Sequence, residues 1–478
     1  MKRKFLRGRS FRPLISLFVL TSLLVIALSA APSFAQSGTP AGNPPAGAPA
    51  GAPPDGAAPP GAAGESTSNP AINATCGTVT IDGQSADASS DAVYDSSTSD
   101  VSALCVINGG SIAVTNPTIT KTGDTSSADS SSFYGLNAAV LVGSGSTTTL
   151  EGGTVTTDGA GTNGLFATGE GASIAASDLS IEAIGDGAHA VMATLGGALT
   201  LDNVTMYTTG AHSGAVATDR GSGTITVTDS TVTTTGQDSP AIYSTGAISA
   251  TGGTYTATGA EAAVIEGSNS ITLTDVDLSS TFADKWGVMI YQSFSGDAEG
   301  SEGVFTMTGG SLTYTSSSGP LFFITNATGS VTLSGVEVTV DSGILAQAAA
   351  TDRWGTSGSN GGHLVLLADA QALTGNLVAD SISTLDITLQ NGSSLIGAIN
   401  PDTAASAVSV TLDATSSWTV TADSFVTTLE GAIITGDAIS NIIGGGHNVY
   451  YDATAAANQT FAGLTYSLVG GGELLPVS

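Results

Sequence analysis

Basic residues are scarce in this 478-residue sequence, which has 10 Lys and Arg against 40 Asp and Glu. Because most of the ten lie within the first twelve residues, the rest of the chain keeps only Lys121, Arg220, Lys285 and Arg353. A surface this acidic repels nucleic acid and anionic lipid. We therefore expect no nucleic-acid partner, and direct binding of polyanionic sugars is disfavoured.

Cysteine is almost absent, since Cys76 and Cys105 are the only two. They do not form a Cys-x-x-Cys motif, and the four histidines are scattered, which argues against redox chemistry and a zinc site. No metal or cofactor is expected. An even number of cysteines in an exported chain favours a disulfide. We expect Cys76 and Cys105 to be linked and to fasten the N-terminal end of the fold.

A long apolar run occurs near the start, from Leu14 to Ala31. It follows a basic segment and precedes Ser33-Phe34-Ala35, a small-x-small cleavage site. Residues 1–35 are therefore predicted to be a secretory signal peptide, which makes the rest of the chain extracellular or displayed at the cell surface. If the signal is not cleaved, the run of about 18 residues is long enough to anchor the chain in a membrane.

Residues 36–70 are rich in Pro, Gly and Ala. Such a segment lacks the side chains to build a core, so it is expected to be a disordered or semi-extended linker. It serves either as a simple tether or as a stalk that lifts the following domain away from a cell wall or membrane.

One pattern recurs eight times between residues 147 and 345, at intervals of roughly 25 residues. Each copy has an apolar anchor, namely Val155, Ile181, Met206, Val232, Tyr255, Leu278, Leu312 and Val338. Five positions earlier stand Leu150, Ala176, Leu201, Val227, Ala250, Leu273, Met307 and Leu333, and two further back Thr148, Ile174, Leu199, Ile225, Ile248, Ile271, Phe305 and Val331. A third apolar patch follows the anchor in each copy: Leu165, Val191, Val216, Ile242, Val264, Val288, Leu321 and Ile344.

Alternation on both sides of a short Gly- or Asp-containing corner predicts a strand, a turn and a second strand. With the third patch, each repeat supplies three short strands and no helix, which is typical of a solenoid. The repeats are too short and too poor in aromatic residues for a β-propeller blade. The sequence therefore predicts an all-β fold, a right-handed parallel β-helix.

The same pattern, less regular, extends the solenoid in both directions, so that we assign it to residues 71–432. Ile112, Val114, Ile119 and Val140 are the expected inward positions of the early coils, and Trp418 is expected in the core of a late one. Residues 433–478 show no further coil pattern and are predicted to form a β cap. A cap is needed because an open solenoid end exposes unpaired strand edges.

Two excursions interrupt the repeats, at residues 279–303 and 346–362. The first contains Asp284-Lys285-Trp286-Gly287 and an acidic segment, residues 297–303; the second contains Asp352-Arg353-Trp354-Gly355. Loops on a rigid scaffold often carry recognition. Lys285, Trp286, Arg353 and Trp354 are therefore candidate ligand-binding residues. The alternative is that each tryptophan only covers a gap left by its irregular coil.

An enzyme is the main alternative to a binding protein. A lyase acting on uronates needs basic groups that converge, whereas the few here are dispersed. A glycoside hydrolase needs two carboxylates about 5 to 10 Å apart, and the repeat alignment places Asp178, Asp202 and Asp229 near one corner. Acids at corners more often bond their own backbone.

Binding to ice or another crystalline surface is a third class, suggested by the many threonines. Such binding requires an unbroken row of one residue type. The row after the anchor is broken by Glu182 and Tyr207, and the row before it by Asp277 and Glu337. Threonine is common at exposed strand positions in any case.

The exported start, the Ser/Thr/Gly/Val coils, the segment from Arg353 to Gly362 and the closing segment from Tyr450 to Pro476 resemble bacterial adhesin-like β-helix proteins of the pectate-lyase-type superfold. The resemblance covers residues 76–478 and is mostly architectural. The chain departs from autotransporter adhesins at its end, where too few residues follow the last clear coil for a membrane barrel to be expected. A sortase-type wall signal is not expected either. The resemblance implies a binding or structural protein without catalysis, whose partner is a glycan or a host or matrix protein, with a polysaccharide-active enzyme as the alternative.

Overall fold

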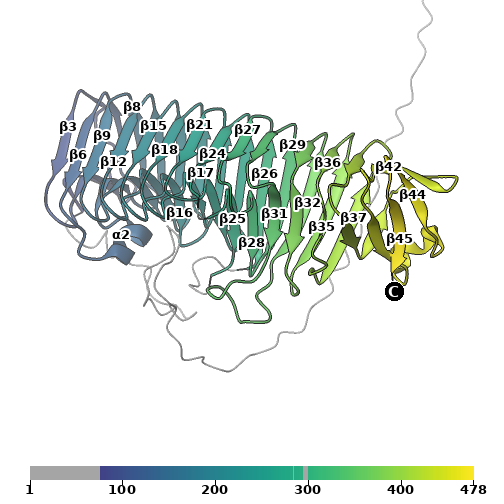
Figure 1. Ribbon diagram of the computed structural model, residues 1–478. Coiled ribbons are helices and arrows are strands. Elements are labelled where there is room, and N and C mark those ends of the chain that lie inside the picture. The colour runs from purple at the N-terminus through teal and green to yellow at the C-terminus, as the bar shows by residue number, and fades with distance from the viewer. Residues whose placement is uncertain (1–75, 284, 294–299, 478) are drawn as a thin grey trace, which may run out of the picture. The chain divides into compact units, whose positions relative to one another are not determined.

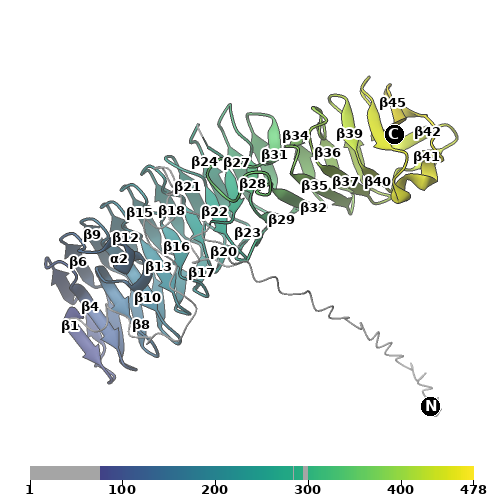
Figure 2. The ribbon, with the colours of Figure 1, turned by 90° about the horizontal axis from the view of Figure 1, so that it is seen from below.

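The computed structural model describes residues 76–283, 285–293 and 300–477. The expected signal peptide 1–35 and linker 36–70 lie outside these residues, as do Asp284 and residues 294–299 of the first excursion. Within the described residues the chain forms a parallel β-solenoid, as the repeats predicted (Figures 1 and 2). Each regular coil adds one strand to each of three parallel sheets, called A, B and C, and a mixed sheet D forms near the C-terminus.

The strands of sheets A and B follow the order of the coils. Sheet A contains β1 (Gly77–Asp82), β4 (Ser102–Ile107), β7 (Ala138–Val142), β10 (Asn163–Thr168), β13 (Val191–Thr194), β16 (Val216–Asp219), β19 (Ile242–Ser244), β22 (Ala263–Glu266), β25 (Val288–Tyr291), β28 (Phe322–Thr325), β31 (Ile344–Ala348) and β34 (Asn376–Ala379). Sheet B contains β2 (Ser89–Ser90), β5 (Ser111–Thr115), β8 (Thr147–Glu151), β11 (Ser173–Ser177), β14 (Ala198–Asp202), β17 (Thr224–Thr228), β20 (Ala247–Thr251), β23 (Ser270–Thr274), β26 (Glu302–Thr308), β29 (Thr328–Ser334), β32 (His363–Asp369), β35 (Thr384–Gln390), β37 (Ala407–Leu412) and β40 (Thr428–Glu430).

Sheet C is built from strands of the regular coils, and sheet D is built from strands of the last coils. Sheet C contains β3 (Val93–Ser96), β6 (Thr118–Thr122), β9 (Thr154–Asp158), β12 (Ser180–Ala183), β15 (Thr205–Thr208), β18 (Thr231–Thr234), β21 (Thr254–Ala257), β24 (Asp277–Ser280), β27 (Ser311–Tyr314) and β30 (Glu337–Val340). Sheet D contains β33 (Ala372–Thr374), β36 (Ser394–Ile396), β38 (Ser417–Thr419), β39 (Ser424–Val426), β41 (Ile434–Thr435), β42 (Ala438–Ile443), β43 (Val449–Asp452), β44 (Tyr466–Val469) and β45 (Glu473–Val477). Two short helices accompany them, α2 (Ala128–Tyr134) and the 3-10 helix η1 (Ala456–Phe461).

The strand register confirms the repeat alignment. The anchors Val155, Ile181 and Met206 face one another in sheet C, and the later anchors continue the same row to Val338. The two earlier apolar positions form two rows on sheet B, without a shift from β8 to β29. The expected inward residues of the early coils, Ile112, Val114, Ile119 and Val140, lie in these rows or in sheet A and are buried.

The third apolar patch was assigned with the wrong register in three copies. Ala263 and Phe322 face Val288, so Val264 and Leu321 lie one residue away from the inward row, and Ala346 occupies the place assigned to Ile344. The reason is that strands of sheet A are apolar at consecutive positions, so hydrophobicity alone does not mark which residue points inward.

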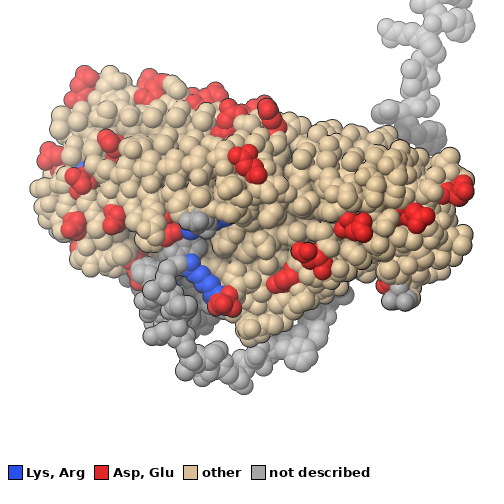
Figure 3. All heavy atoms as spheres, viewed as in Figure 1, with Lys and Arg blue, Asp and Glu red and all other residues tan. Residues whose placement is uncertain are grey.

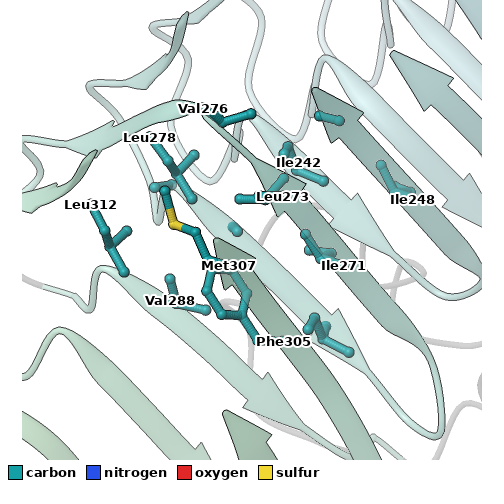
Figure 4. Close-up of a cluster of buried hydrophobic side chains, with 14 of the residues drawn as sticks. Ile242, Ile248, Ile271, Leu273, Val276, Leu278, Val288, Phe305, Met307 and Leu312 are labelled. Carbon is teal, nitrogen blue, oxygen red and sulfur yellow. The ribbon is translucent and has the colours of Figure 1, made fainter. Parts of the chain in front are cut away.

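The core lies between the sheets. Figure 4 shows side chains from sheet A, such as Val288, meeting those of sheet B, such as Phe305, and of sheet C, such as Leu312. Strands of sheets B and C alternate between buried and exposed residues, for example along β17 and β18. This alternation puts the branched and aromatic residues inside and the Thr and Ser residues outside.

Beyond residue 433, where a β cap was expected, the strands belong to the mixed sheet D. β42 pairs with β44 and β43 pairs with β45 in parallel, while β41 pairs with β42 and β44 with β45 antiparallel. Gly-rich corners, residues 444–446 and 470–472, replace the apolar spacing of the regular repeats and conceal these coils in the sequence. Trp418 is fully buried, as predicted.

The disulfide between Cys76 and Cys105 is present, with 5.8 Å between the two Cα atoms. Cys105 lies in β4, the second strand of sheet A, and Cys76 directly precedes β1, the first. The link therefore joins neighbouring coils at the N-terminal end of the described solenoid, which is the position that the spacing predicted.

Candidate functional site on the outer face of sheet A

From β4 to β28, sheet A is buried on both of its faces. In β10, β13, β16, β22 and β25 every residue is buried, whereas strands of sheets B and C alternate. Continuous apolar strands are typical of sheets covered on both sides. The outward residues that face one another from coil to coil form what we call the apolar row: Cys105, Leu141, Phe166, Met192, Ala217, Tyr243, Val264, Met289 and Phe323.

Several described side chains pack against the apolar row, namely Tyr134 at the end of α2, Leu136 shortly after it, and the two loop tryptophans, Trp286 and Trp354. α2 begins at Ser127, whose side chain accepts a hydrogen bond from the amide of Ser130. It ends at Gly135, which adopts the left-handed conformation that glycine allows. This brief helix thus covers the early part of sheet A.

Glu266 is the centre of a buried polar cluster beside the apolar row. Its Oε2 atom accepts hydrogen bonds from the hydroxyls of Tyr243 and, at 2.7 Å, Tyr291, and its Oε1 atom accepts one from Ser293. All four side chains are buried. A buried carboxylate is tolerated when hydrogen bonds replace its hydration. Burial, followed by the charge of Glu266, raises the pKa of both tyrosines well above the usual value.

Lys285 lies between two carboxylates. Its Nζ atom donates a hydrogen bond to Oδ1 of Asp238 and lies 3.6 Å from Oε2 of Glu261. Glu261 is fully buried, and this burial raises the pKa of its carboxyl, against the opposing effect of the Lys285 charge. The positive charge of Lys285 is therefore matched by acidic groups of the same protein.

The two candidate tryptophans rest on aromatic side chains of sheet A. The Trp286 ring stacks on Phe323, with 4.1 Å between the ring centroids and 8° between the planes. The Trp354 ring lies 4.8 Å from that of Tyr291, and the guanidinium of Arg353 lies 4.6 Å from the centroid of the Trp354 ring. Both tryptophans remain half-buried, so part of each ring faces outward.

Hydrogen bonds hold the loop backbone at or next to each tryptophan. The hydroxyl of Tyr314 lies 2.8 Å from the carbonyl of Lys285, next to Trp286. The side-chain amide of Asn360 donates to the carbonyls of Thr351 and Trp354, at 2.7 and 2.6 Å. These bonds fix the backbone on which each ring is mounted, so the rings do not depend on a ligand for their position.

A glycine follows each tryptophan for a steric reason. At Gly287 an added Cβ would lie only 2.8 Å from the carbonyl oxygen of Leu321. Gly355 adopts φ +78°, and an added Cβ would overlap with Asn326 and Asn360. The repeated Trp-Gly pair thus lets each loop approach its coil closely enough for the ring to reach sheet A.

The structure brings the two loops to the same face, which the sequence left open. Phe323 in β28 and Tyr291 in β25 belong to neighbouring strands of sheet A, and both point outward. Sequence reasoning missed Tyr243, Glu266 and Tyr291. These residues could have been found from the sequence, because they lie in or at the end of runs of consecutive apolar residues, which are typical of a strand covered on both sides.

Asp178, Asp202 and Asp229 lie at the corner between sheets B and C, as the alignment predicted. Asp178 and Asp229 have φ of +53° and +46°, values that suit a tight turn. Oδ1 of Asp178 accepts a hydrogen bond of 2.6 Å from the side-chain amide of Asn203, its counterpart on the next coil. Asp202 ends strand β14. These contacts support the turn role of the corner acids over a catalytic one.

The other features of the described residues are less distinctive. A shallow groove of about 320 Å³ beside β17, β20, β23 and β26 is lined by small and polar residues and Glu302, without aromatic or basic side chains. Among the described residues no three His, Cys, Asp or Glu side chains are grouped to hold a metal, and no helix is long and apolar enough to cross a membrane. Figure 3 shows one face on which acidic groups are spread over a mostly uncharged surface and the few basic groups lie next to acidic ones.

Comparison of the chain with protein families, with curated proteins and with solved structures finds no match. The fold and the contacts described above therefore carry the functional argument alone.

Proposed function

We propose that this chain is an exported protein, extracellular or displayed at the cell surface, that acts as an adhesin-like binding surface without catalysis. Its ligand contact centres on Trp286 and Trp354, with Arg353 beside them. The observation that carries the proposal is that two loops far apart in the sequence mount half-exposed tryptophans on neighbouring strands of sheet A. Trp and Arg are enriched at binding hot spots.

The partner is a glycan or a host or matrix protein. The Trp286 ring stacks one face on Phe323, and its other face suits stacking on a sugar ring or on an apolar side chain. The Trp354 ring already carries the guanidinium of Arg353, so these two side chains would contact a ligand together. Lys285 contributes by holding the Trp286 loop to Asp238, since its charge is engaged there. The acidic chain disfavours anionic glycans, so neutral ones are the first choice.

The experiment uses an array of immobilised glycans and extracellular-matrix proteins, probed with the secreted protein. Trp286→Ala and Trp354→Ala are each expected to weaken the binding that the array detects by about thirtyfold, because a hot-spot residue contributes about 2 kcal/mol. Tyr207→Ala is the matched control, since Tyr207 is a half-buried aromatic residue on sheet C. It should bind as the unchanged protein does.

Chemical denaturation of the same variants separates binding from packing. Replacement of the fully buried Trp418 by Ala gives the scale for a structural tryptophan, about 3 to 5 kcal/mol. The loop variants should lose much less stability than Trp418→Ala. If they lose as much stability while binding is retained, the tryptophans only cover irregular coils and the proposal is wrong.

A further inference from the structure

The outer face of sheet B carries a regular array of hydroxyl groups. Over five successive strands, β17, β20, β23, β26 and β29, two adjacent outward positions hold Thr or Ser without exception. We call these ten residues the hydroxyl grid: Thr226, Ser249, Thr272, Thr306 and Thr332 in one row, and Thr228, Thr251, Thr274, Thr308 and Ser334 in the other.

The grid is open and uncharged. All ten side chains are exposed or half-buried, and the neighbouring outward row, Thr224, Ala247, Ser270, Val304 and Ser330, also contains no charged or aromatic residue. Acidic residues lie at the borders: at the corner beside the second row, at Glu302, and at Asp202 and Asp369, which continue the second row at its two ends.

In the same five coils, one of the two outward rows of sheet C is interrupted by charges, at Asp277 and Glu337. The other row of sheet C is uninterrupted and holds Thr233, Thr256, Ser279, Thr313 and Thr339. In the grid, the register keeps each hydroxyl opposite the next, and Oγ of Ser249 lies 3.3 Å from Oγ1 of Thr226. The general preference of strands for threonine explains the composition of both sheets. The grid differs in that neither of its two rows carries a charge over these five strands.

The hydroxyl groups of the grid repeat at regular distances in two directions. Neighbouring coils lie about 4.8 Å apart, and outward residues two positions apart along a strand lie about 6.6 Å apart. These two repeats approximate the rectangular oxygen lattice on the prism face of ice. Each threonine offers a hydroxyl that can replace a lattice water and a methyl group that fits between waters.

We propose that the hydroxyl grid binds the surface of ice. A polysaccharide fits less well, because the three outward rows lack the aromatic rings on which sugars stack. A polyanion is excluded by the absence of Lys and Arg from these rows. The grid lies on a different sheet from the tryptophans, so this inference does not depend on the proposed function.

Ice affinity tests the proposal with the full secreted chain. The protein is mixed with slowly growing polycrystalline ice, and the fraction incorporated into the ice is compared with that left in the liquid. The unchanged protein is expected in the ice, and Thr272→Lys, which puts a charge in the middle of the grid, should be excluded from it. Thr231→Lys is the matched control, because Thr231 is an exposed outward threonine on sheet C.

The outcomes separate clearly. Incorporation of the unchanged protein and of Thr231→Lys, together with exclusion of Thr272→Lys at an unchanged melting temperature, supports the proposal. It is overturned if the unchanged protein is excluded from ice, if Thr272→Lys enters ice as well as the control does, or if both lysine variants are excluded alike. Exclusion from ice with binding to microcrystalline cellulose would assign the grid to a polysaccharide instead.

Discussion

The outer faces of sheets A and B are made by the same coils but differ in almost every respect. From β4 to β28 the face of sheet A is buried, carries aromatic rings and holds the Glu266 cluster, whereas that of sheet B from β17 to β29 is open and lined mostly with Thr and Ser. The irregular segments explain the difference. α2 and the two excursions lie before or after strands of sheet A, while the corner between sheets B and C has two residues in each coil from β8 to β30.

A two-residue corner fixes the register of the strands on both sides of it. Sheets B and C are therefore held in a constant register from β8 to β30. A slip of one residue in the pairing would turn the outward residues of a strand inward. The connections that lead into and out of sheet A vary in length from coil to coil, and the strand register is kept. The contrast indicates that new loops, and with them recognition, accumulate around sheet A.

The largest loss of stability on the sheet A side is expected when Glu266 is replaced. Glu266→Ala leaves the hydroxyls of Tyr243, Tyr291 and Ser293 buried without their acceptor. Each bond to a charged group is worth about 1.5 to 3 kcal/mol, and the three are not independent, so a loss of about 4 kcal/mol is expected. The free energy of unfolding from urea titration measures it.

Glu302→Ala is the control for that loss, because Glu302 is an exposed carboxylate on sheet B. It should change the free energy of unfolding by about 0.5 kcal/mol or less. Equal losses for the two variants would mean that the outer face of sheet A is not the more strongly constrained of the two.

The disulfide is expected to give the next largest effect. Replacing Cys76 and Cys105 together by Ser opens a loop with a sequence separation of 29. Loop closure of this length is worth about 3 to 4 kcal/mol. Urea titration of the double variant should show that loss, and reduction of the unchanged protein should reproduce it. A reduced protein as stable as the oxidised one would contradict the prediction.

Much of the solenoid could be predicted from the sequence, because its inward rows on sheets B and C alternate with polar residues. The anchors, such as Val155 and Met206, were therefore placed in the correct register. The inward and outward positions of sheet A could not be predicted in the same way. There Val264 and Ile265 are both apolar and both buried, and only the strand pairing shows which one points outward.

The candidate site was predictable only in part. Trp286 and Trp354 drew attention because tryptophan is rare and each sits in an insertion. Glu266 was hidden, since an acid at the end of an apolar strand looks like a surface residue. The long-range contacts that bury it come from β19 and β25, and no local pattern encodes them.

A pH-dependent loss of stability should also arise on the sheet A side. His189, two residues before β13, is buried, and its Nδ1 atom lies 2.8 Å from the carbonyl oxygen of Gly214. Burial lowers the pKa of His189 to about 4 from 6.5, although the bond to Gly214 opposes the shift. The unfolded chain therefore binds more protons than the folded protein between these pH values.

It follows that the contribution of His189 is complete above pH 6.5 and is lost as the pH falls towards 4. The full loss corresponds to about 3 kcal/mol. Urea titrations across this range should show a smaller loss for His189→Gln than for the unchanged protein. His363→Gln serves as the control, because His363 is exposed on sheet B. If the His189 variant keeps the same pH profile, the imidazole is not protonated on unfolding.

The smallest expected effect gives the sharpest comparison, because one substitution is made on both faces. Thr194 points outward from sheet A, is fully buried, and donates a hydrogen bond of 2.9 Å to the hydroxyl of Thr168. Thr226 points outward from sheet B and is exposed.

Thr194→Ala leaves the Thr168 hydroxyl buried without that donor and opens a small gap, so a loss of about 1 to 2 kcal/mol is expected. Thr226→Ala should stay within about 0.5 kcal/mol of the unchanged protein, because water replaces what the hydroxyl loses. The difference between the two urea midpoints is the measurement. If Thr226→Ala proves as costly as Thr194→Ala, the hydroxyls of sheet B are bound into the fold rather than presented to solvent, and the grid would then not be free to bind a surface.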